Sequence, residues 1–327
     1  MKAILWTKYG PPEGLILGEI DKPTPKKKEV LIKIYATTVT AGDCEMRILK
    51  LPYGLKFFIR LFNGIRRPKR IKVLGQELSG RIEAIGEEVT RFKVGDDIFA
   101  STDFFMGAYA EYKCLPENGV IALKPQNQSY EEAATVPLGG TNSLHFLRSA
   151  NIQPGDKILI NGAGGSIGTI GVQLAKHWGA EVTAIDSREK LDMLKSIGAD
   201  HVIDFAQEDF TKNEKKYDVI FDIVGKAPIS GCVNSLNEEG ILLLGNLSSS
   251  IILRAKWNSW RSKKKIITAV ADATSEDLQK LKTMIEEGVL KTVIDRSYHL
   301  EDMVEAHKYV ESGQKTGNVV IAVTKPP

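Results

Sequence analysis

The sequence predicts an α/β protein with two domains, one mostly antiparallel β domain and one doubly wound parallel sheet. Three observations predict this fold class. Residues 157–186 have the pattern of an apolar strand, a glycine-rich turn, an amphipathic helix, a second strand and a terminal acid. Beyond residue 200, strand-like segments alternate with helical ones, which is typical of a parallel sheet. Residues 1–122 instead show short alternating strands separated by glycine and proline.

Each predicted element follows from its local pattern. The strands expected in the β domain are 29–36, 78–85, 97–100 and 108–113. The strands expected in the parallel sheet are 158–160, 182–185, 201–204, 217–224, 241–244 and 265–270, joined by right-handed crossovers. The helices expected between and after them include 188–197, 276–287 and 301–310, and a last strand is expected at 319–323.

Composition excludes several classes of protein. The chain has 327 residues, of which 43% are hydrophobic and 26% charged, as in ordinary globular proteins. Its net charge of +3 gives no global electrostatic reason to expect nucleic acid as a partner. Three cysteines lie far apart, so a disulfide framework is not expected. There is no signal-like N-terminus and no apolar run of about 18 residues, so we expect a cytoplasmic protein without a transmembrane segment.

The glycine-rich turn has the order of residues that a dinucleotide needs. Small residues let backbone N–H groups approach a pyrophosphate, whose charge the N-terminus of the following helix stabilises. The second strand ends at Asp186, where an acid can accept hydrogen bonds from ribose hydroxyls. A tight strand-to-helix turn in another doubly wound protein is the alternative interpretation. The residues of the predicted turn are Ala163, Gly164, Gly165, Ser166, Ile167 and Gly168.

Long segments spread along the whole chain also have family-typical sequences. They include EVLIKIYATTVTAGD, LGQELSGRIEAIGEEVTRFKVGDDIFA, AATVPLGGTNSLHFLR, NGAGGSIGTIGVQLAK, YDVIFDIVG and KTGNVVIAV. In these segments the chain resembles the zinc-free, quinone-oxidoreductase-like branch of the medium-chain dehydrogenase/reductase superfamily. The resemblance implies a GroES-like catalytic domain at 1–122 and 292–327, a Rossmann dinucleotide-binding domain at 123–291, and a homodimer.

The same resemblance bears on metal binding. Zinc-dependent relatives carry cysteine and histidine ligands where this chain has Thr40 and Gln76, and both are poor zinc ligands. Cys44 is four residues out of register, and a buried small side chain is its expected role. The four-cysteine lobe of those relatives is missing, and the five histidines are scattered. We therefore expect no zinc.

The resemblance implies that five residues lie near the cleft that holds the coenzyme: Thr40, Asp43, Tyr53, Gln76 and Glu77. Thr40 is a candidate to contact the coenzyme, and the other four are candidates for the chemistry. Asp43 and Glu77 are candidates to relay a proton, and the alternative is that each anchors a loop by hydrogen bonds. Tyr53 is a candidate proton donor or stacking surface, although its spacing from Asp43 differs slightly from the family pattern.

Further residues are candidates to bind the coenzyme. Asn142 takes the place of a family threonine near the nicotinamide, and a helix-cap role is the alternative. Gly245 and Asn246 follow the fifth parallel strand, where open sheets bind ligands, and Asn318 is a candidate from the C-terminal segment.

The choice between NADH and NADPH is nearly even on the residues present. Asp186 favours NADH, because a carboxylate repels a 2′-phosphate. Three nearby residues are able to bind that phosphate: Ser187, Arg188 and Lys190. Replacing Asp186 by serine is expected to shift the preference toward NADPH.

Residues 54–72, GLKFFIRLFNGIRRPKRIK, fit a short amphipathic helix followed by a basic loop. A lid or packing helix with a solvated basic end is the simplest interpretation. A peripheral contact with a membrane surface is the second, and nucleic-acid binding is the weakest because the helix is strongly apolar.

The function expected from these patterns is NAD(P)H-dependent reduction of quinones or α,β-unsaturated carbonyls by direct hydride transfer. Without a Lewis acid, the acceptor must delocalise the charge it receives, as conjugated carbonyls do. A zinc-free alcohol dehydrogenase or aldehyde reductase is one alternative. A dinucleotide-binding protein without catalytic activity is the other.

Overall fold

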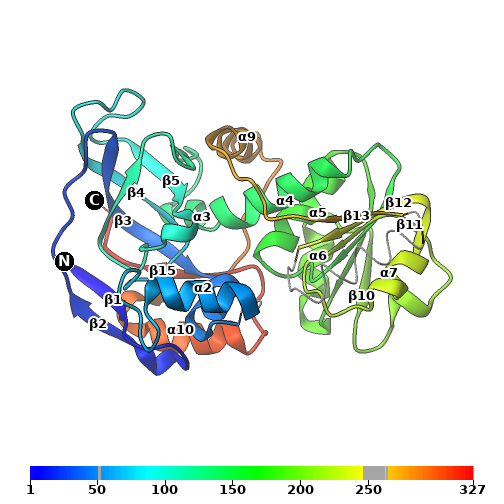
Figure 1. Ribbon diagram of the computed structural model, residues 1–327. Helices are drawn as coiled ribbons and strands as arrows, with labels where there is room; N and C mark the ends of the chain where they lie inside the picture. Colours follow the sequence, from blue (N-terminus) through cyan, green and yellow to red (C-terminus); the bar gives the residue numbers. More distant parts are fainter. Residues whose placement is uncertain (51–52, 246–261, 263, 327) are drawn as a thin grey trace. The chain divides into compact units, whose positions relative to one another are not determined.

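A computed structural model describes residues 1–50, 53–245, 262 and 264–326, and within it the chain forms two compact units. The first comprises residues 1–138, 274–287 and 292–327, and the second comprises residues 139–273 and 288–291 (Figure 1). The first unit therefore extends beyond residue 122. One cause is Tyr130, whose hydroxyl donates a hydrogen bond to Asp97 at 2.6 Å, and another is Asn127, whose side chain donates to the carbonyl of Ile285 at 2.9 Å.

The first unit contains a mostly antiparallel sheet, as predicted. Its strand order is β14-β15-β3-β4-β5-β7, β6 pairs with β3, and β14 and β15 run parallel. A separate two-stranded sheet, β1-β2, was not predicted. The strands are β1 Lys2–Trp6, β2 Leu15–Glu19, β3 Glu29–Val39, β4 Glu77–Ile85, β5 Asp97–Ser101, β6 Tyr112–Pro116, β7 Ile121–Leu123, β14 Ile294–His299 and β15 Asn318–Ala322.

The predicted strand at 108–113 is shifted toward the C-terminus, to β6. The preceding residues bond to β1 instead: the carbonyl of Tyr109 accepts from the N–H of Ile4 at 2.8 Å, and Ala110 bridges to Ala3. A local alternating pattern cannot reveal this competition between two partner strands.

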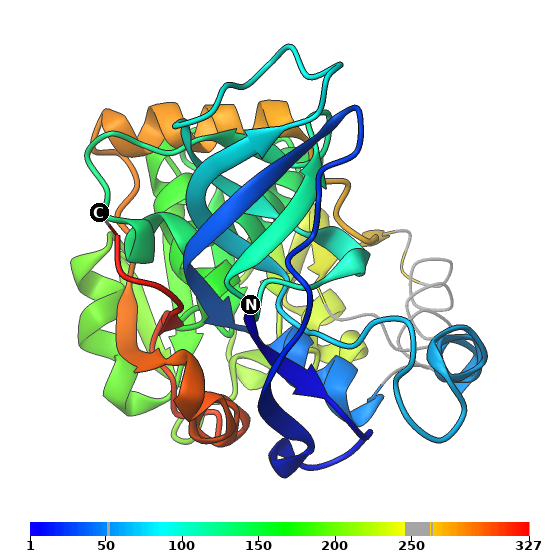
Figure 2. The same ribbon diagram turned by 90° about the vertical axis from the view of Figure 1, so that its left-hand side faces the viewer.

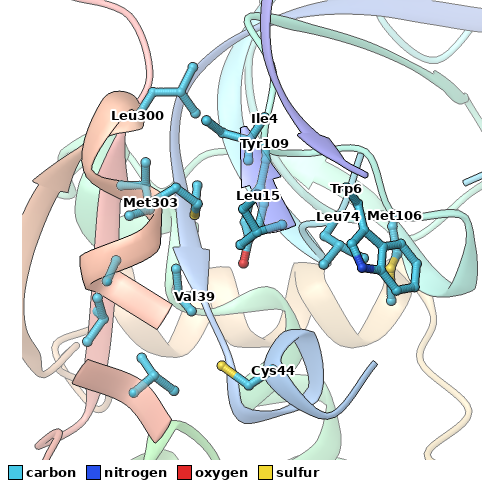
Figure 3. Close-up of a cluster of buried hydrophobic side chains, with 14 of the residues drawn as sticks. Ile4, Trp6, Leu15, Val39, Cys44, Leu74, Met106, Tyr109, Leu300 and Met303 are labelled. Atoms are coloured by element: carbon cyan, nitrogen blue, oxygen red, sulfur yellow. The ribbon is translucent and has the colours of Figure 1, made fainter. Parts of the chain in front are cut away.

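Helices of the first unit complete its core. They are α1 Ala41–Ile48, α2 Tyr53–Asn63, α3 Tyr130–Ala134, α9 Ser275–Glu286 and α10 Met303–Glu311, with short 3-10 helices at Pro12–Gly14, Asp103–Phe105 and Leu300–Asp302. One buried cluster gathers Trp6 from β1, Cys44 from α1 and Met303 from α10 (Figure 3). Cys44 is 5% exposed, which confirms its expected role as a buried small side chain.

The second unit is built on a six-stranded parallel sheet with the order β10-β9-β8-β11-β12-β13. All six predicted parallel strands are confirmed. They are β8 Lys157–Asn161, β9 Glu181–Asp186, β10 His201–Asp204, β11 Tyr217–Asp222, β12 Leu236–Leu244 and β13 Lys265–Thr268. Its helices are α4 Pro137–Ser149, which begins in the first unit, α5 Ser166–His177, α6 Leu191–Ser196 and α7 Ile229–Asn234, with 3-10 helices at Arg188–Lys190 and Phe210–Lys212.

The order of the strands places a topological switch point beside β8. From β8 the sheet grows through β9 and β10 on one side and through β11, β12 and β13 on the other. Ile158, Leu159 and Ile160 are fully buried, as expected for a parallel strand covered on both faces. Ligands of open α/β sheets bind at the carboxyl ends of the strands at such a point.

Candidate functional site

The glycine-rich turn lies at the carboxyl end of β8 and leads directly into α5. Gly162 makes the turn with φ +85°, and the N–H groups of Gly162 and Ala163 both donate to the carbonyl of Ile185 at 3.0 Å. Gly165 is the N-cap of α5 and has no side chain to cap the first helical turn. The N-terminus of α5, with its positive end of the helix dipole, therefore opens at this turn, and such a terminus is a candidate to bind an anion.

Two glycines of this turn are closely packed, Gly168 against backbone atoms and Gly164 against side chains. A Cβ on Gly168 would lie 2.4 Å from the Cα of Ala163, so α5 approaches the turn more closely than any side chain allows. A Cβ on Gly164 would lie 2.6 Å from Cδ of Lys190 and 2.9 Å from Oδ2 of Asp186. Ala163 occupies the first glycine position of the pattern and is fully buried.

Asp186 anchors this turn. Its Oδ2 accepts a hydrogen bond from the N–H of Gly164 at 2.8 Å, and its Oδ1 accepts one from the N–H of Ser187 at 2.9 Å. Oδ1 also lies 3.0 Å from Nζ of Lys190, and both side chains are about nine-tenths buried. The carboxylate that was predicted to bind ribose is thus already engaged by two N–H groups and neutralised by an ammonium group.

A second cluster of polar residues lies in the first unit, where β3 passes into α1. Thr40 is the N-cap of α1 and forms a capping box with Asp43. Asp43 is fully buried, and its carboxylate accepts hydrogen bonds from the N–H and hydroxyl of Thr40 at 3.0 and 2.7 Å and from the N–H of Gly75 at 3.2 Å. Oγ1 of Thr40 lies 2.9 Å from Oε1 of Gln76. Three predicted residues are therefore brought together.

Glu77 begins β4 and is also fully buried. Its carboxylate accepts hydrogen bonds from the hydroxyl of Thr38 and, at 2.7 Å, from the N–H of Leu138. The pKa of Glu77 is raised to about 7, chiefly by burial; the charge of Asp43 contributes to the increase, while the hydrogen bonds from Thr38 and Leu138 and the charge of Lys315 oppose it. Burial likewise raises the pKa of Asp43 to about 6. Both carboxyl groups consequently exchange a proton close to neutral pH.

The other predicted residues are more dispersed. Tyr53 is the first residue of α2. Asn142 lies in the interior of α4, so it does not cap that helix. The N–H of Gly245 donates to the carbonyl of Asp222 at 2.9 Å at the end of β12, and Asn246 lies outside the described residues.

Asn318 is the first residue of β15 and is 2% exposed. Its Nδ2 donates to the carbonyl of Val293 at 3.1 Å, and its Oδ1 accepts no hydrogen bond from the part of the chain that the structure describes. A buried amide oxygen without a donor is a candidate to accept one from a ligand.

Sequence reasoning missed three features of this region. Lys315 is 9% exposed, and its charge stabilises the carboxylate of Glu77. Thr38, which donates to that carboxylate, belongs to the threonine-rich end of β3. Phe104 and Phe105 are 72% and 78% exposed and closely follow Thr102, whose N–H donates to the carbonyl of Gln76 at 2.8 Å. Two adjacent phenylalanines in a polar segment were the sequence signal from which these exposed rings could have been predicted.

Clusters of three or more histidine, cysteine or acidic side chains that could hold a metal do not occur among the described residues. Cys44 and His307 approach each other, with Sγ 3.3 Å from Nδ1, but they are only a pair. Burial lowers the pKa of His307 to about 3 and raises that of Cys44 well above its ordinary value, so both are neutral core groups.

Comparisons with known proteins agree with this architecture. Residues 26–125 match the alcohol dehydrogenase GroES-like domain, and residues 197–321 match a family described as zinc-binding dehydrogenase. A 2-methylene-furan-3-one reductase of Solanum lycopersicum is 32% identical, covering 98% of this chain and 79% of the relative. An NADPH-dependent alkenal/one oxidoreductase of Arabidopsis thaliana is 31% identical with the same coverage. The structure of the quinone oxidoreductase from Coxiella burnetii is 27% identical, with a TM-score of 0.89 and 99% of each chain covered.

A glycine cradle at the switch point of a parallel sheet, joined to a GroES-like β domain, defines a two-domain dehydrogenase or reductase of the nucleotide-dependent class. The chain belongs to the quinone-oxidoreductase-like branch of the medium-chain dehydrogenase/reductase superfamily, as its sequence had suggested.

Proposed function

We propose that the protein uses NAD(P)H to reduce quinones or α,β-unsaturated carbonyls by direct hydride transfer, without a metal ion. The observation that carries this proposal is the cradle at the N-terminus of α5, where Cβ atoms on Gly164 and Gly168 would clash. The curated relatives include an alkenal/one oxidoreductase and several quinone oxidoreductases, which supports this class of acceptor.

The donor set of the first unit supports metal-free chemistry. Thr40 and Gln76 offer a hydroxyl and an amide, and neither competes for zinc with thiolate or imidazole. The nearby charge of Lys315 also opposes a cation beside Glu77. Acceptors whose negative charge spreads over a conjugated system need no Lewis acid.

When bound, the coenzyme supplies the hydride, and the residues of this chain hold the reactants and the proton. We assign the pyrophosphate to the turn from Ala163 to Gly168 and keep Asn142, Gly245, Asn246 and Asn318 as further coenzyme contacts. The hydroxyl of Thr40 lies between the carboxylate of Asp43 and the amide of Gln76, so it is placed to pass a proton and to orient a carbonyl oxygen. Phe104 and Phe105 offer exposed rings on which a flat acceptor can stack.

The test compares acceptors under one set of conditions. NAD(P)H oxidation is measured with 1,2-naphthoquinone, with an enone and with a simple ketone, each in the presence and absence of a chelator. We expect turnover of the quinone or the enone, little turnover of the ketone, and no effect of the chelator. Activity lost to the chelator would restore a metal mechanism. Ketone turnover would favour an alcohol dehydrogenase, and coenzyme binding without turnover of any acceptor would favour a protein without catalytic activity.

We further propose that NADPH is the preferred coenzyme. Lys190 neutralises Asp186, so a 2′-phosphate near this pair meets no net negative charge, while both oxygens of the carboxylate that would bind a 2′-hydroxyl are engaged. Ser187 and Arg188 remain candidates for direct contact with the phosphate.

The homodimer and the cytoplasmic location expected from the sequence stay predictions. Among the described residues there is no helix that could span a bilayer.

Replacing Lys190 by methionine is expected to turn the preference toward NADH. The variant leaves the charge of Asp186 uncompensated, and about 1.4 kcal/mol of repulsion corresponds to about a tenfold loss in the ratio of kcat/KM for NADPH to that for NADH. Steady-state kinetics with both coenzymes measure this ratio. Lys195→Met removes the same charge from an exposed site in α6 and serves as the control. An unchanged ratio in Lys190→Met would remove the ion pair from coenzyme choice.

Asp186→Ser provides a complementary result. The serine removes the negative charge, so the ratio is still expected to move toward NADPH. The N–H of Gly164 also loses its acceptor, so we expect KM to rise for both coenzymes. If Asp186 only contacted the ribose, its replacement would not disturb the turn in this way.

A further inference from the structure

The helix α2 turns its apolar side chains toward solvent. Its exposed side chains, together with that of the next apolar residue, are here called the apolar face: Leu55, Phe57, Phe58, Leu61, Phe62 and Ile65. Each is between 47% and 67% exposed. Figure 2 shows α2 and the loop that follows it, in light blue, at one edge of the first unit. A contiguous group of this kind on a protein surface marks an interaction site.

The opposite side of α2 contacts the core through Ile59 and the following loop through Asn63. Ile59 packs against the buried cluster around Trp6, and Asn63 is 1% exposed. Oδ1 of Asn63 accepts hydrogen bonds from the N–H groups of Arg70 and Ile71 at 3.0 and 2.6 Å. An ordinary surface helix buries its apolar side and exposes its polar side, whereas α2 exposes most of its apolar side chains. The simple interpretation of α2 as a packing helix does not account for it.

The loop after α2 adds a dense positive charge. Residues 54–72 contain seven basic residues and no acid: Lys56, Arg60, Arg66, Arg67, Lys69, Arg70 and Lys72. Four of these cations line a groove of about 980 Å³ together with Leu61, Phe62 and Ile65. They are Arg66, Arg67, Lys69 and Arg70.

The loop has a defined conformation. Gly64 adopts φ +118°, and its carbonyl accepts a hydrogen bond from the hydroxyl of Tyr9 at 2.7 Å. The guanidinium of Arg70 lies 4.7 Å from the centre of the Phe62 ring, so cations and apolar side chains occupy one continuous surface.

We propose that this surface docks on a lipid bilayer that carries anionic headgroups. Apolar side chains that enter the acyl boundary, beside cations at headgroup level, are the two components of interfacial binding. A second copy of this chain is a poor occupant, because a two-fold interface would place the basic loop against itself. Nucleic acid would leave the apolar face in water. The proposal is independent of the redox reaction and does not need a bound coenzyme.

The test is co-sedimentation with vesicles of phosphatidylcholine alone and of phosphatidylcholine mixed with phosphatidylserine. We expect the wild-type protein to pellet with the mixed vesicles and to be released by salt. Phe57→Ser/Phe58→Ser and Arg66→Gln/Arg67→Gln/Arg70→Gln should each abolish pelleting. The loss of three cations corresponds to about a 10²-fold fall in the partition coefficient.

Two matched controls keep the result specific. Phe205→Ser removes a phenylalanine that is 61% exposed in the second unit, and Lys26→Gln/Lys27→Gln/Lys28→Gln removes three exposed lysines from the first. Both should pellet as the wild type does. Circular dichroism of every variant establishes that it is folded.

Three results would overturn the proposal. One is wild-type protein that stays in the supernatant with mixed vesicles at low salt. Another is pelleting that the phenylalanine and arginine variants retain. The third is that the wild-type protein binds no lipid but self-associates in sedimentation velocity, while Phe57→Ser/Phe58→Ser is monomeric. That result would assign the surface to a second copy of the chain.

Discussion

Gly168→Ala is expected to lower kcat/KM for NAD(P)H by about 10²-fold, the effect of displacing a binding group by about 1 Å. The new Cβ would lie 2.4 Å from Cα and 2.5 Å from the carbonyl oxygen of Ala163. Both neighbours are backbone atoms, so α5 or the turn itself must shift. The N–H groups to which we assign the pyrophosphate shift with it. Coenzyme titration and steady-state kinetics measure the loss.

Gly171→Ala is the matched control for this result. It lies one turn further along α5, and its Cβ would meet only side-chain atoms at 3.6 Å or more, which is ordinary contact. Alanine is also the better helix former, so stability should be equal or higher while coenzyme binding is unchanged. Similar kinetics in the two variants would contradict the assignment of the coenzyme to this turn.

Glu77→Gln is expected to stabilise the protein at high pH and not at low pH. Burial raises the pKa of Glu77 from its ordinary 4.5 to about 7 in the folded state. Between these values the folded protein holds a proton that the unfolded chain releases, so the free energy of unfolding falls as pH rises. The loss amounts to about 3 kcal/mol. A glutamine has no proton to lose and can keep both the contact to Thr38 and that to Leu138.

Urea unfolding at pH 5 and pH 8 measures the effect. We expect the stability of Glu77→Gln relative to the wild type to increase by about 2.5 kcal/mol across this range. Glu117→Gln should show little change between these two pH values, because hydrogen bonds from the N–H groups of Arg91 and Thr90 lower the pKa of Glu117, and the stability that its charge contributes is lost only below its ordinary pKa of 4.5. Parallel pH curves for Glu77→Gln and the wild type would show that Glu77 stays charged in the folded protein.

The parallel sheet could be predicted because its signals are local. Each of its strands contains a short apolar run bounded by polar or glycine residues. The strand-turn-helix order from Lys157 to Asp186 is by itself typical of a dinucleotide-binding unit. The β domain was predicted less well. The β1-β2 sheet was missed, and β6 was displaced, because the partner of an alternating strand lies far away in the sequence and several partners compete.

The candidate site shows the same division. The types of residue at Thr40, Asp43, Gln76 and Glu77 were evident from the sequence, but their roles depend on burial. Only the tertiary structure shows that both acids are enclosed, which brings their pKa values toward neutrality, and that Lys315 lies near Glu77. The effective charge of Asp186 was likewise hidden, since it depends on the ion pair with Lys190 and the hydrogen bond from Gly164.

By itself, the sequence determined the fold class, the position of the glycine-rich turn to which we assign the coenzyme, and the absence of the usual zinc-ligating residue types from the positions where zinc-dependent relatives carry them. These properties follow from residue types at short spacing, which the chain carries whether or not it is folded. The tertiary structure decided which carboxyl groups are buried or paired and which face of α2 meets water. Those outcomes depend on residues far apart in the chain, because solvation and electrostatic interaction are set by neighbours in space.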